Sequence, residues 1–228
     1  MADASSVAAC EQHWNELHLN QPPAVPAWRI WRYDTPTLVL GCSQRKLLAG
    51  AHAGLEVLPR RAGGGAVLVG PWMLGLSVAL PSAHPRVVPS AVGSYRWLAE
   101  LLERWLRAAG IRDARALAPG SPALQRGPAE LDWACFGGLS PWELVADGQR
   151  KITGLAQVRR RDVVLLVAGT LLMTPDWKLL AASLDRPVSQ AEALARRTTS
   201  WTDLLGQPPD TDQATAALDA LLAEALDA

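Results

Sequence analysis

One lysine lies in a segment whose sequence predicts a rigid backbone. Lys151 follows the dipeptide Asp147-Gly148, a typical tight turn because glycine adopts positive φ without steric cost. The residues on either side, 142–145 and 152–158, are typical of short strands, so Lys151 should lie just after a hairpin turn. Arginine is far commoner than lysine in this chain, which suggests a chemical role for this lysine. The alternative is a solvated charge at a strand edge.

A second segment could bring backbone amides close to a ligand. Gly63, Gly64 and Gly65 follow a predicted strand and the pair Arg60-Arg61. Such a run is costly for folding because glycine loses the most backbone entropy, and it commonly allows a ligand to approach the backbone closely. The spacing matches neither the dinucleotide-binding fingerprint nor the P-loop. The guanidinium groups favour an anionic ligand, whereas a flexible hairpin tip is the alternative without function.

The composition limits the classes of protein to which the chain can belong. It has 228 residues, of which 22 are basic, 22 are acidic and 49% are hydrophobic. A chain of this kind can bury a sizeable core, and it does not have the composition of a disordered protein. Its zero net charge argues against a nucleic-acid partner. We expect no membrane partner, because the N-terminus lacks a signal peptide and no apolar run reaches the roughly 18–20 residues that span a bilayer.

The cysteine pattern argues against metal and disulfide chemistry. Cys10, Cys42 and Cys135 are far apart in the sequence and odd in number. No CxxC pair exists, so neither a zinc site nor a disulfide framework is predicted. We therefore expect a reduced, cytoplasmic protein without a metal site. Cys10 and Cys42 are expected to be packing residues.

Hydrophobic periodicity and turn residues predict many short elements, which indicates an α+β (mixed α/β) domain without internal repeats. Residues 163–172 are too continuously apolar for an exposed strand and should lie deep in a sheet. The clearest helix is 90–109, with Ser90 as its cap and Gly110 at its end. A surface loop is expected at 118–130. Strands are expected at 28–33, 37–41, 55–58, 72–80, 142–145, 152–158 and 162–173, and helices at 4–19, 45–53, 90–109, 190–197, 202–205 and 212–228.

Three segments in order resemble the motifs of one protein family. Residues 60–67 read RRAGGGAV, which resembles the RRxGGGAV signature of lipoate–protein ligases. Residues 150–157 read RKITGLAQ and are similar to that family's RKI(S/T)GxAQ segment, and residues 40–44, LGCSQ, resemble its LGxxQ turn. The resemblance covers roughly residues 28–185. The superfamily contains lipoate–protein ligases, octanoyltransferases and biotin–protein ligases.

This resemblance implies one catalytic domain over residues 1–228, with a mixed, mostly antiparallel sheet packed with helices and no separate C-terminal accessory domain. It implies that Lys151 faces the carbonyl of a lipoyl or octanoyl group, where a cation stabilises developing charge. The acceptor would be a lysine of a lipoyl carrier domain, of the glycine-cleavage or 2-oxoacid dehydrogenase type. The substrate-binding residues implied by the motifs are Arg60, Arg61, Gly63, Gly64, Gly65, Ala66, Gly154, Ala156 and Gln44.

Cys135 favours one branch of the superfamily. Cys135-Phe136, followed by SPWELV at 140–145 and then by the lysine segment, is similar to the cysteine-type octanoyltransferases. In that branch the matching cysteine carries the acyl chain as a thioester, an acyl carrier protein is a candidate donor, and no cofactor is required. The chemistry is reasonable, because a thiolate is the nucleophile and a nearby ammonium favours it. The alternative is a buried structural thiol.

Two departures from the family pattern keep other functions open. Val69 stands where ligases commonly have a histidine, and Trp72 stands where many relatives have glycine. An ATP-dependent ligase that uses ATP and Mg²⁺ and forms lipoyl-AMP is therefore weakened but not excluded. A degenerate module that binds lipoate or a lipoyl domain without turnover is a non-enzymatic alternative. Trp72 would either narrow the acyl or nucleotide slot or pack in the core.

Overall fold

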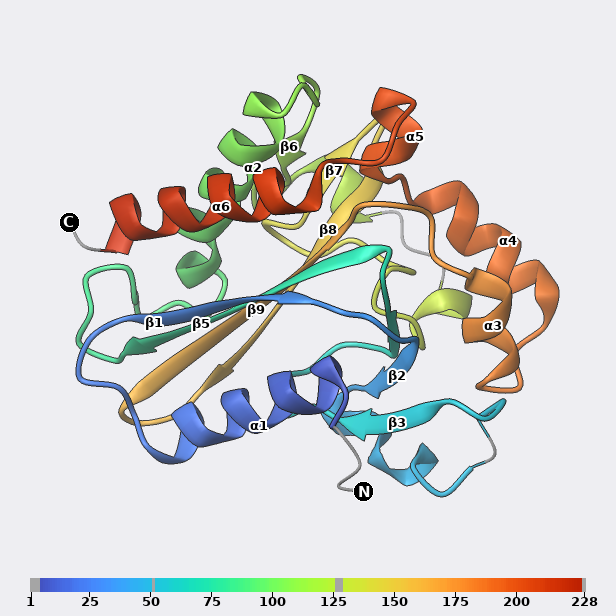
Figure 1. Ribbon diagram of the computed structural model, residues 1–228, viewed down its shortest axis with the longest axis horizontal. Helices are drawn as coiled ribbons and strands as arrows, with labels where there is room; N and C mark the ends of the chain where they lie inside the picture. Colours follow the sequence, from blue (N-terminus) through green and yellow to red (C-terminus); the bar gives the residue numbers. More distant parts are fainter. Residues whose placement is uncertain (1–4, 51, 126–128, 227–228) are drawn as a thin grey trace.

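The computed structural model describes residues 5–50, 52–125 and 129–226, and a six-stranded sheet lies at its centre (Figure 1). The strand order is β1-β5-β9-β8-β7-β6, and every neighbouring pair is antiparallel. The strands of this sheet are β1 Ala27–Arg32, β5 Met73–Pro81, β6 Arg115–Ala116, β7 Leu144–Ala146, β8 Arg150–Arg159 and β9 Val163–Leu171.

The apolar strands β5 and β9 lie side by side in the interior of this sheet. β9 pairs with β5 from Val163 to Leu171 and with β8 on its other side. Both of its faces are covered by other elements, which explains why its sequence is apolar without alternation. The prediction of a deeply buried strand at 162–173 is therefore confirmed, as is the hairpin of β7 and β8 around Asp147-Gly148.

A smaller sheet packs beside the first one and holds the segment with the three glycines. Its order is β3-β2-β4, with β2 parallel to β3 and antiparallel to β4. The strands are β2 Thr37–Leu40, β3 Glu56–Pro59 and β4 Val67–Val69. The sequence did not predict β4, because a strand of three residues between glycines is too short to give a period. The three strands fix both ends of the glycine loop.

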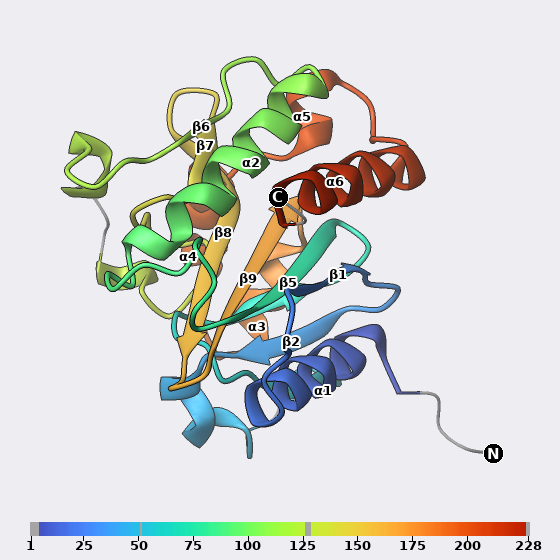
Figure 2. The same cartoon turned by 90° about the vertical axis from the view of Figure 1, so that its left-hand side faces the viewer.

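Helices cover both faces of the central sheet (Figures 1 and 2). α1, Val7–Asn20, lies on one face, where Leu19 packs against Leu165. α2, Arg96–Ala108, and α6, Thr211–Leu226, cover the other face. α3 Trp177–Ala182, α4 Val188–Arg197 and α5 Trp201–Leu205 follow β9. None of the helices in the described part of the chain is long and apolar enough to cross a membrane.

Several predicted helix boundaries were wrong. The helix predicted at 90–109 begins at Arg96, because Ser90 accepts a hydrogen bond from Gly93 and forms a separate turn. Gly110 does end this helix, with φ +104°. The helix predicted at 45–53 is instead a 3-10 helix, Cys42–Leu47, and Ala51 lies outside the described residues. α3 was not predicted; its six residues are too few to show a period, although Asp176 caps it.

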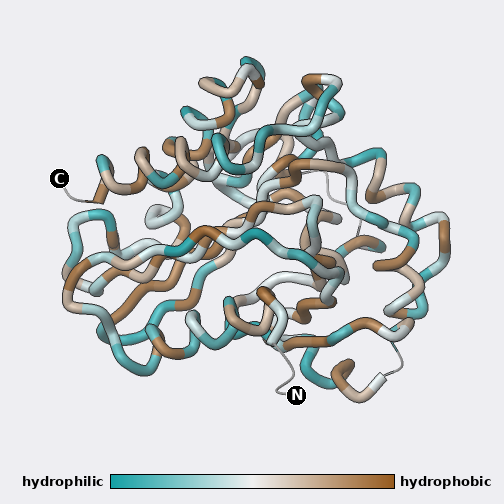
Figure 3. Tube along the Cα trace, in the orientation of Figure 1, coloured by the Kyte–Doolittle hydropathy of each residue, from teal (hydrophilic) through white to brown (hydrophobic). Residues whose placement is uncertain are grey.

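The remaining predictions match the structure more closely. Helices were expected at 190–197 and 202–205, where α4 and α5 lie, and the helix predicted at 212–228 is α6, with 227–228 outside the described residues. The helix predicted at 4–19 begins at Val7, and Ala4 is not described. The predicted loop 118–130 contains two short 3-10 turns, and 126–128 are not described. The α+β class is confirmed, and hydrophobic residues recur along both the strands and the helices (Figure 3).

Candidate active site

Cys135 and the three glycines lie side by side, although they are far apart in the sequence. The amide of Ala66 donates to the carbonyl of Trp133 at 2.7 Å, and the amide of Cys135 donates to the carbonyl of Ala66 at 2.8 Å. A Cβ on Gly65 would lie 2.5 Å from the Trp133 carbonyl oxygen, so only glycine allows this approach. Gln44 also donates to the Trp133 carbonyl, at 2.9 Å.

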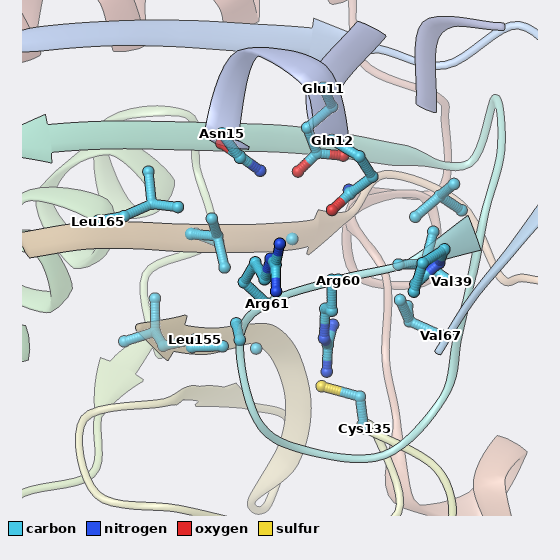
Figure 4. Close-up of a pocket in the computed structure, with 18 of the residues that line it drawn as sticks. Glu11, Gln12, Asn15, Val39, Arg60, Arg61, Val67, Cys135, Leu155 and Leu165 are labelled. Atoms are coloured by element: carbon cyan, nitrogen blue, oxygen red, sulfur yellow. The ribbon is translucent and has the colours of Figure 1, made fainter. Parts of the chain in front are cut away.

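Arg60 shapes the glycine loop from within. Its Nη2 donates to the carbonyls of Gly63 and Gly65, both at 2.9 Å, while its buried Nε has no partner among the described residues. Gly64 has φ +90°, and the position of a Cβ there is 2.9 Å from Arg60 Nη2 and 3.8 Å from Cys135 Sγ. Figure 4 shows the guanidinium directed towards the sulfur. Arg60 therefore places positive charge beside the thiol.

A cavity of about 300 Å³ begins at Cys135 and runs between the two sheets and α1 (Figure 4). We name it the acyl cavity. Much of its wall is apolar and comes from β8 and β9, on which Leu155 and Leu165 face it. Gly154 and Ala156 also line it, as do Val67 and Val69 of β4 and the residues Val39 and Met73.

The cavity has a polar wall on the side of α1. Glu11 and Asn15 come from this helix, and Tyr33 donates a hydrogen bond to Glu11 at 2.7 Å. Burial raises the pKa of Glu11 to about 7, against the opposing effects of the Tyr33 hydrogen bond and of Arg60. Burial also raises the pKa of Tyr33 well above its usual value. This wall was not predicted, because Glu11 lies in an ordinary amphipathic helix pattern.

A second, more open cavity of about 510 Å³ meets the first at Cys135. We name it the outer cavity. The three glycines line it together with Tyr95, Asp132 and Gln157. Burial raises the pKa of Tyr95 to about 12, so the hydroxyl stays protonated at neutral pH. Leu155 and Ala156 also line both cavities, so Cys135 lies where the two cavities meet.

Lys151 lies behind the wall of the acyl cavity and is only 1% exposed. The alternative of a solvated charge at a strand edge is therefore excluded. Its Nζ donates to Glu143 Oε1 at 2.6 Å and to the carbonyls of Cys135 and Gly138 at 2.7 and 3.2 Å. Its backbone is held on one side by β7 and on the other by the Thr199 amide. The sequence did not predict Glu143 as the partner of Lys151. A glutamate between Trp142 and an apolar strand could have indicated a buried carboxylate that needs a cation.

The other residues of interest are dispersed. Arg61 pairs with Glu16 of α1 at 2.6 Å, where both line the acyl cavity on its α1 side. Trp72 lines neither cavity; its Nε1 donates to the Leu68 carbonyl and its ring packs on the core beside the small sheet. The prediction that Cys10 and Cys42 are packing residues was wrong, because both thiols are exposed.

A free thiol at the edge of a cavity with a largely apolar wall places a potential nucleophile beside space for an alkyl chain. The family model described as lipoyl protein ligase A/B catalytic domain matches residues 7–223, and the chain belongs to this family. It is thus an enzyme of the acyltransferase and ligase group, as its sequence motifs implied.

Curated relatives are named octanoyltransferase LipM. The one from Kyrpidia tusciae is 34% identical over 215 residues, which are 89% of this chain and 76% of the relative. The one from Oceanobacillus iheyensis is 30% identical over 179 residues, 76% of this chain and 62% of the relative. The chain therefore spans about three fifths to three quarters of the length of these relatives.

Solved structures support the fold. A lipoate-protein ligase A bound with ATP has a TM-score of 0.60 at 23% identity, over 89% of this chain and 73% of that one. The putative lipoate protein ligase Ta0514 of T. acidophilum has a TM-score of 0.66 at 20% identity, over 95% and 80%. The predicted lipoate ligase-like catalytic fold is confirmed.

Proposed function

We propose that this enzyme transfers an octanoyl group from a thioester donor to a lysine of a lipoyl carrier domain through a thioester on Cys135. The observation that carries the proposal is the position of Cys135 at the junction of the acyl cavity and the outer cavity. The names of the relatives favour octanoyl transfer over a ligase or a binding module without turnover. The octanoyl chain occupies the acyl cavity, and the donor and acceptor arms reach the sulfur through the outer cavity.

The reaction takes two steps at one sulfur. The Cys135 thiolate attacks the carbonyl carbon of the octanoyl thioester, the bond from that carbon to the donor sulfur breaks, and the donor leaves as a thiol with the proton from Cys135. The ε-amino group of the acceptor lysine then attacks the Cys135 thioester. An amide forms, the bond between carbon and Cys135 sulfur breaks, and the proton lost by the amine returns to the sulfur.

The predicted site residues have distinct roles in this scheme. The amides of Gly63, Gly64 and Gly65 face the acyl carbonyl, while the Ala66 amide holds the Trp133 carbonyl and so fixes the loop of Cys135. Arg60 and Lys151 provide nearby positive charge for the oxygen as charge develops. Gly154 and Ala156 contact the first carbons of the chain. Arg61 and Gln44 hold the two loops, through Glu16 and the Trp133 carbonyl respectively.

The donor, the acceptor and the compartment follow from this scheme as proposals. An acyl carrier protein is the donor, and a lipoyl domain of the glycine-cleavage or 2-oxoacid dehydrogenase type is the acceptor. Neither ATP nor Mg²⁺ takes part. Exposed free thiols at Cys10 and Cys42 fit a reducing compartment, so we propose the cytoplasm.

A comparison of donors tests the proposal. The protein is incubated with a lipoyl domain and either octanoyl-acyl carrier protein or free octanoate with ATP and Mg²⁺, and octanoylation of the domain is measured by mass spectrometry. We expect transfer from the thioester donor without ATP. Transfer only from octanoate with ATP would establish a ligase instead, and binding without transfer from either donor would establish a binding module.

A further inference from the structure

We infer that Glu143 is a positioning residue for the transfer, because it holds the Lys151 ammonium against the loop that carries Cys135. This inference rests on the proposed function. Glu143 precedes β7, and Lys151 lies on β8, so the pair joins the hairpin to the loop of Cys135.

The contacts of Glu143 use both of its carboxylate oxygens. Oε1 accepts from Lys151 Nζ at 2.6 Å and from the Leu155 amide at 3.4 Å, and Oε2 accepts from the Ser140 amide at 2.8 Å. The side chains of Glu143 and Lys151 are only 4% and 2% exposed. This one carboxylate therefore connects the lysine, the cavity wall at Leu155 and the end of the loop that follows Cys135.

Glu143 is also the counter-charge that fixes the direction of the ammonium. The other two acceptors of Lys151 Nζ are neutral carbonyl oxygens, those of Cys135 and Gly138. Among the described residues, no other carboxylate forms an ion pair with this lysine. A buried charge without its partner is strongly destabilised, so the lysine holds this position only while Glu143 is present.

The ammonium held in this way lies directly behind the wall of the acyl cavity at Gly154. A Cβ on Gly154 would lie 3.6 Å from Lys151 Nζ and 3.7 Å from Phe136 Cζ. Gly154 and Phe136 both line the cavity, so the ammonium lies directly behind the part of the wall that is next to Cys135. The same ammonium fixes the peptide carbonyl of Cys135 itself. Glu143 also lines the outer cavity, but its contact with the reacting groups runs through Lys151.

A double-mutant cycle tests this coupling. The four proteins are wild type, Glu143→Gln, Lys151→Met and the variant with both changes. The amide introduced by Glu143→Gln has one acceptor oxygen where the carboxylate has two, so its NH₂ group would face a donor. The first measurement is the steady-state rate of octanoylation of a lipoyl domain from octanoyl-acyl carrier protein, resolved into kcat and KM. The second is the rate of Cys135 alkylation by iodoacetamide, followed by peptide mass spectrometry.

We expect Glu143→Gln to lower kcat roughly 10- to 100-fold at a KM within about 2-fold of wild type, as for a displaced catalytic group. In the Lys151→Met background the same change should have no further effect, because the path through the lysine is already lost. Additive effects of the two changes, or a wild-type kcat in Glu143→Gln, would overturn the inference. If the wild type alkylates at Cys135 but is never acylated, the proposed function fails, and the alkylation rates still test the coupling.

Two further proteins keep the test decisive. Glu103→Gln is the matched control, because Glu103 also accepts a backbone amide, from Ala116 at 2.8 Å, and pairs with a cation, Arg107, away from the cavities. It should leave both rates unchanged. If the single variants do not fold, Glu143→Met combined with Lys151→Met replaces the ion pair with apolar side chains, which buried sites often tolerate. Alkylation of that protein at the wild-type rate would contradict the inference.

Discussion

The site has a buried glutamate at each end, Glu11 in the wall of the acyl cavity and Glu143 in the wall of the outer cavity, and the two have opposite environments. At the reactive end, which contains Cys135, Lys151 and Glu143, the carboxylate of Glu143 accepts from an ammonium and two amides. At the α1 end, which contains Glu11, Asn15 and Tyr33, Glu11 accepts from a neutral hydroxyl. Figure 4 shows Glu11 and Cys135 on opposite sides of Arg60.

This difference shows how one site separates the chemical step from the binding of the alkyl chain. At the reactive end, Lys151 and Glu143 stay ionised although they are buried, because each is the other's partner. Acyl transfer needs positive charge near the oxyanion that develops, and the buried ammonium provides it. At the α1 end, burial without a counter-charge in direct contact raises the pKa of Glu11 to about 7. A proton on Glu11 removes charge from the part of the cavity that receives an alkyl chain, where charge would be unfavourable.

The largest expected effect comes from breaking the ion pair at the reactive end. Lys151→Met leaves Glu143 buried without a cation, so we expect a loss of about 3–5 kcal/mol in the free energy of unfolding. Glu143→Met in the same chain should recover most of this loss. Urea unfolding followed by circular dichroism measures both. Arg96→Met is the control, because its pair with Glu100 is exposed and should contribute far less. A single variant as stable as wild type would contradict the account.

The α1 end predicts a dependence of stability on pH. Between pH 4.5 and 7 the unfolded chain has released the Glu11 proton and the folded chain still binds it, so stability falls as the pH rises. The expected total is on the order of 3 kcal/mol for a shift from 4.5 to about 7.

Glu11→Gln removes this term while keeping an acceptor for Tyr33. Unfolding by urea at pH 5 and at pH 7.5 should therefore show a smaller loss for the variant than for wild type. The hydrogen bond from Arg61 lowers the pKa of Glu16, so Glu16 is already ionised over this pH range and does not add to the difference. Equal losses in wild type and variant would show that Glu11 is ionised throughout.

The contact between the two loops at the reactive end gives the next effect. Gly65→Ala would place a Cβ 2.5 Å from the Trp133 carbonyl oxygen, so the loop of Cys135 must move. We expect a cost of about 1–3 kcal/mol, as for overpacking, together with loss of Cys135 acylation. Gly63→Ala is the matched control, because a Cβ there meets nothing within 4 Å. Similar thermal unfolding in both variants would disprove the close approach.

The smallest expected effect concerns the length of the acyl chain that the enzyme transfers. Leu165 lies in the cavity wall far from Cys135 (Figure 4), so Leu165→Ala should lengthen the space for the acyl chain. We expect the ratio of decanoyl to octanoyl transfer to rise about 4-fold per methylene accommodated, from roughly 0.8 kcal/mol for each buried CH₂. Leu166→Ala faces the opposite side of β9 and is the control for lost stability. An equal change in the ratio for both variants would place the chain elsewhere.

The sequence predicted the elements that have a clear period or a distinctive turn. β9 has a continuous apolar run and the β7–β8 hairpin has Asp147-Gly148, so both were predictable. The glycine loop was predictable from its motif. β4 and α3 are too short to show a period, and the segment after Ser90 makes its own turn before α2 begins.

The partners inside the site were harder to predict. Lys151 and Cys135 were identified by residue type and position, but the contact of Lys151 with Glu143 depends on how the loop 135–143 folds back on β8. Glu11 is distant in sequence from every motif and comes to the cavity only through the packing of α1. Pairings of this kind follow from tertiary packing, for which a single sequence gives no period.

The central claim is that Cys135 carries the octanoyl group, and intact-mass spectrometry tests it most directly. Wild type and Cys135→Ala are incubated with octanoyl-acyl carrier protein in the absence of an acceptor, and the mass of each protein is measured at once. We predict one octanoyl adduct on wild type, released when a lipoyl domain is added, and none on Cys135→Ala. An adduct that persists in Cys135→Ala, or octanoylation of the lipoyl domain by that variant at the wild-type rate, would contradict the account.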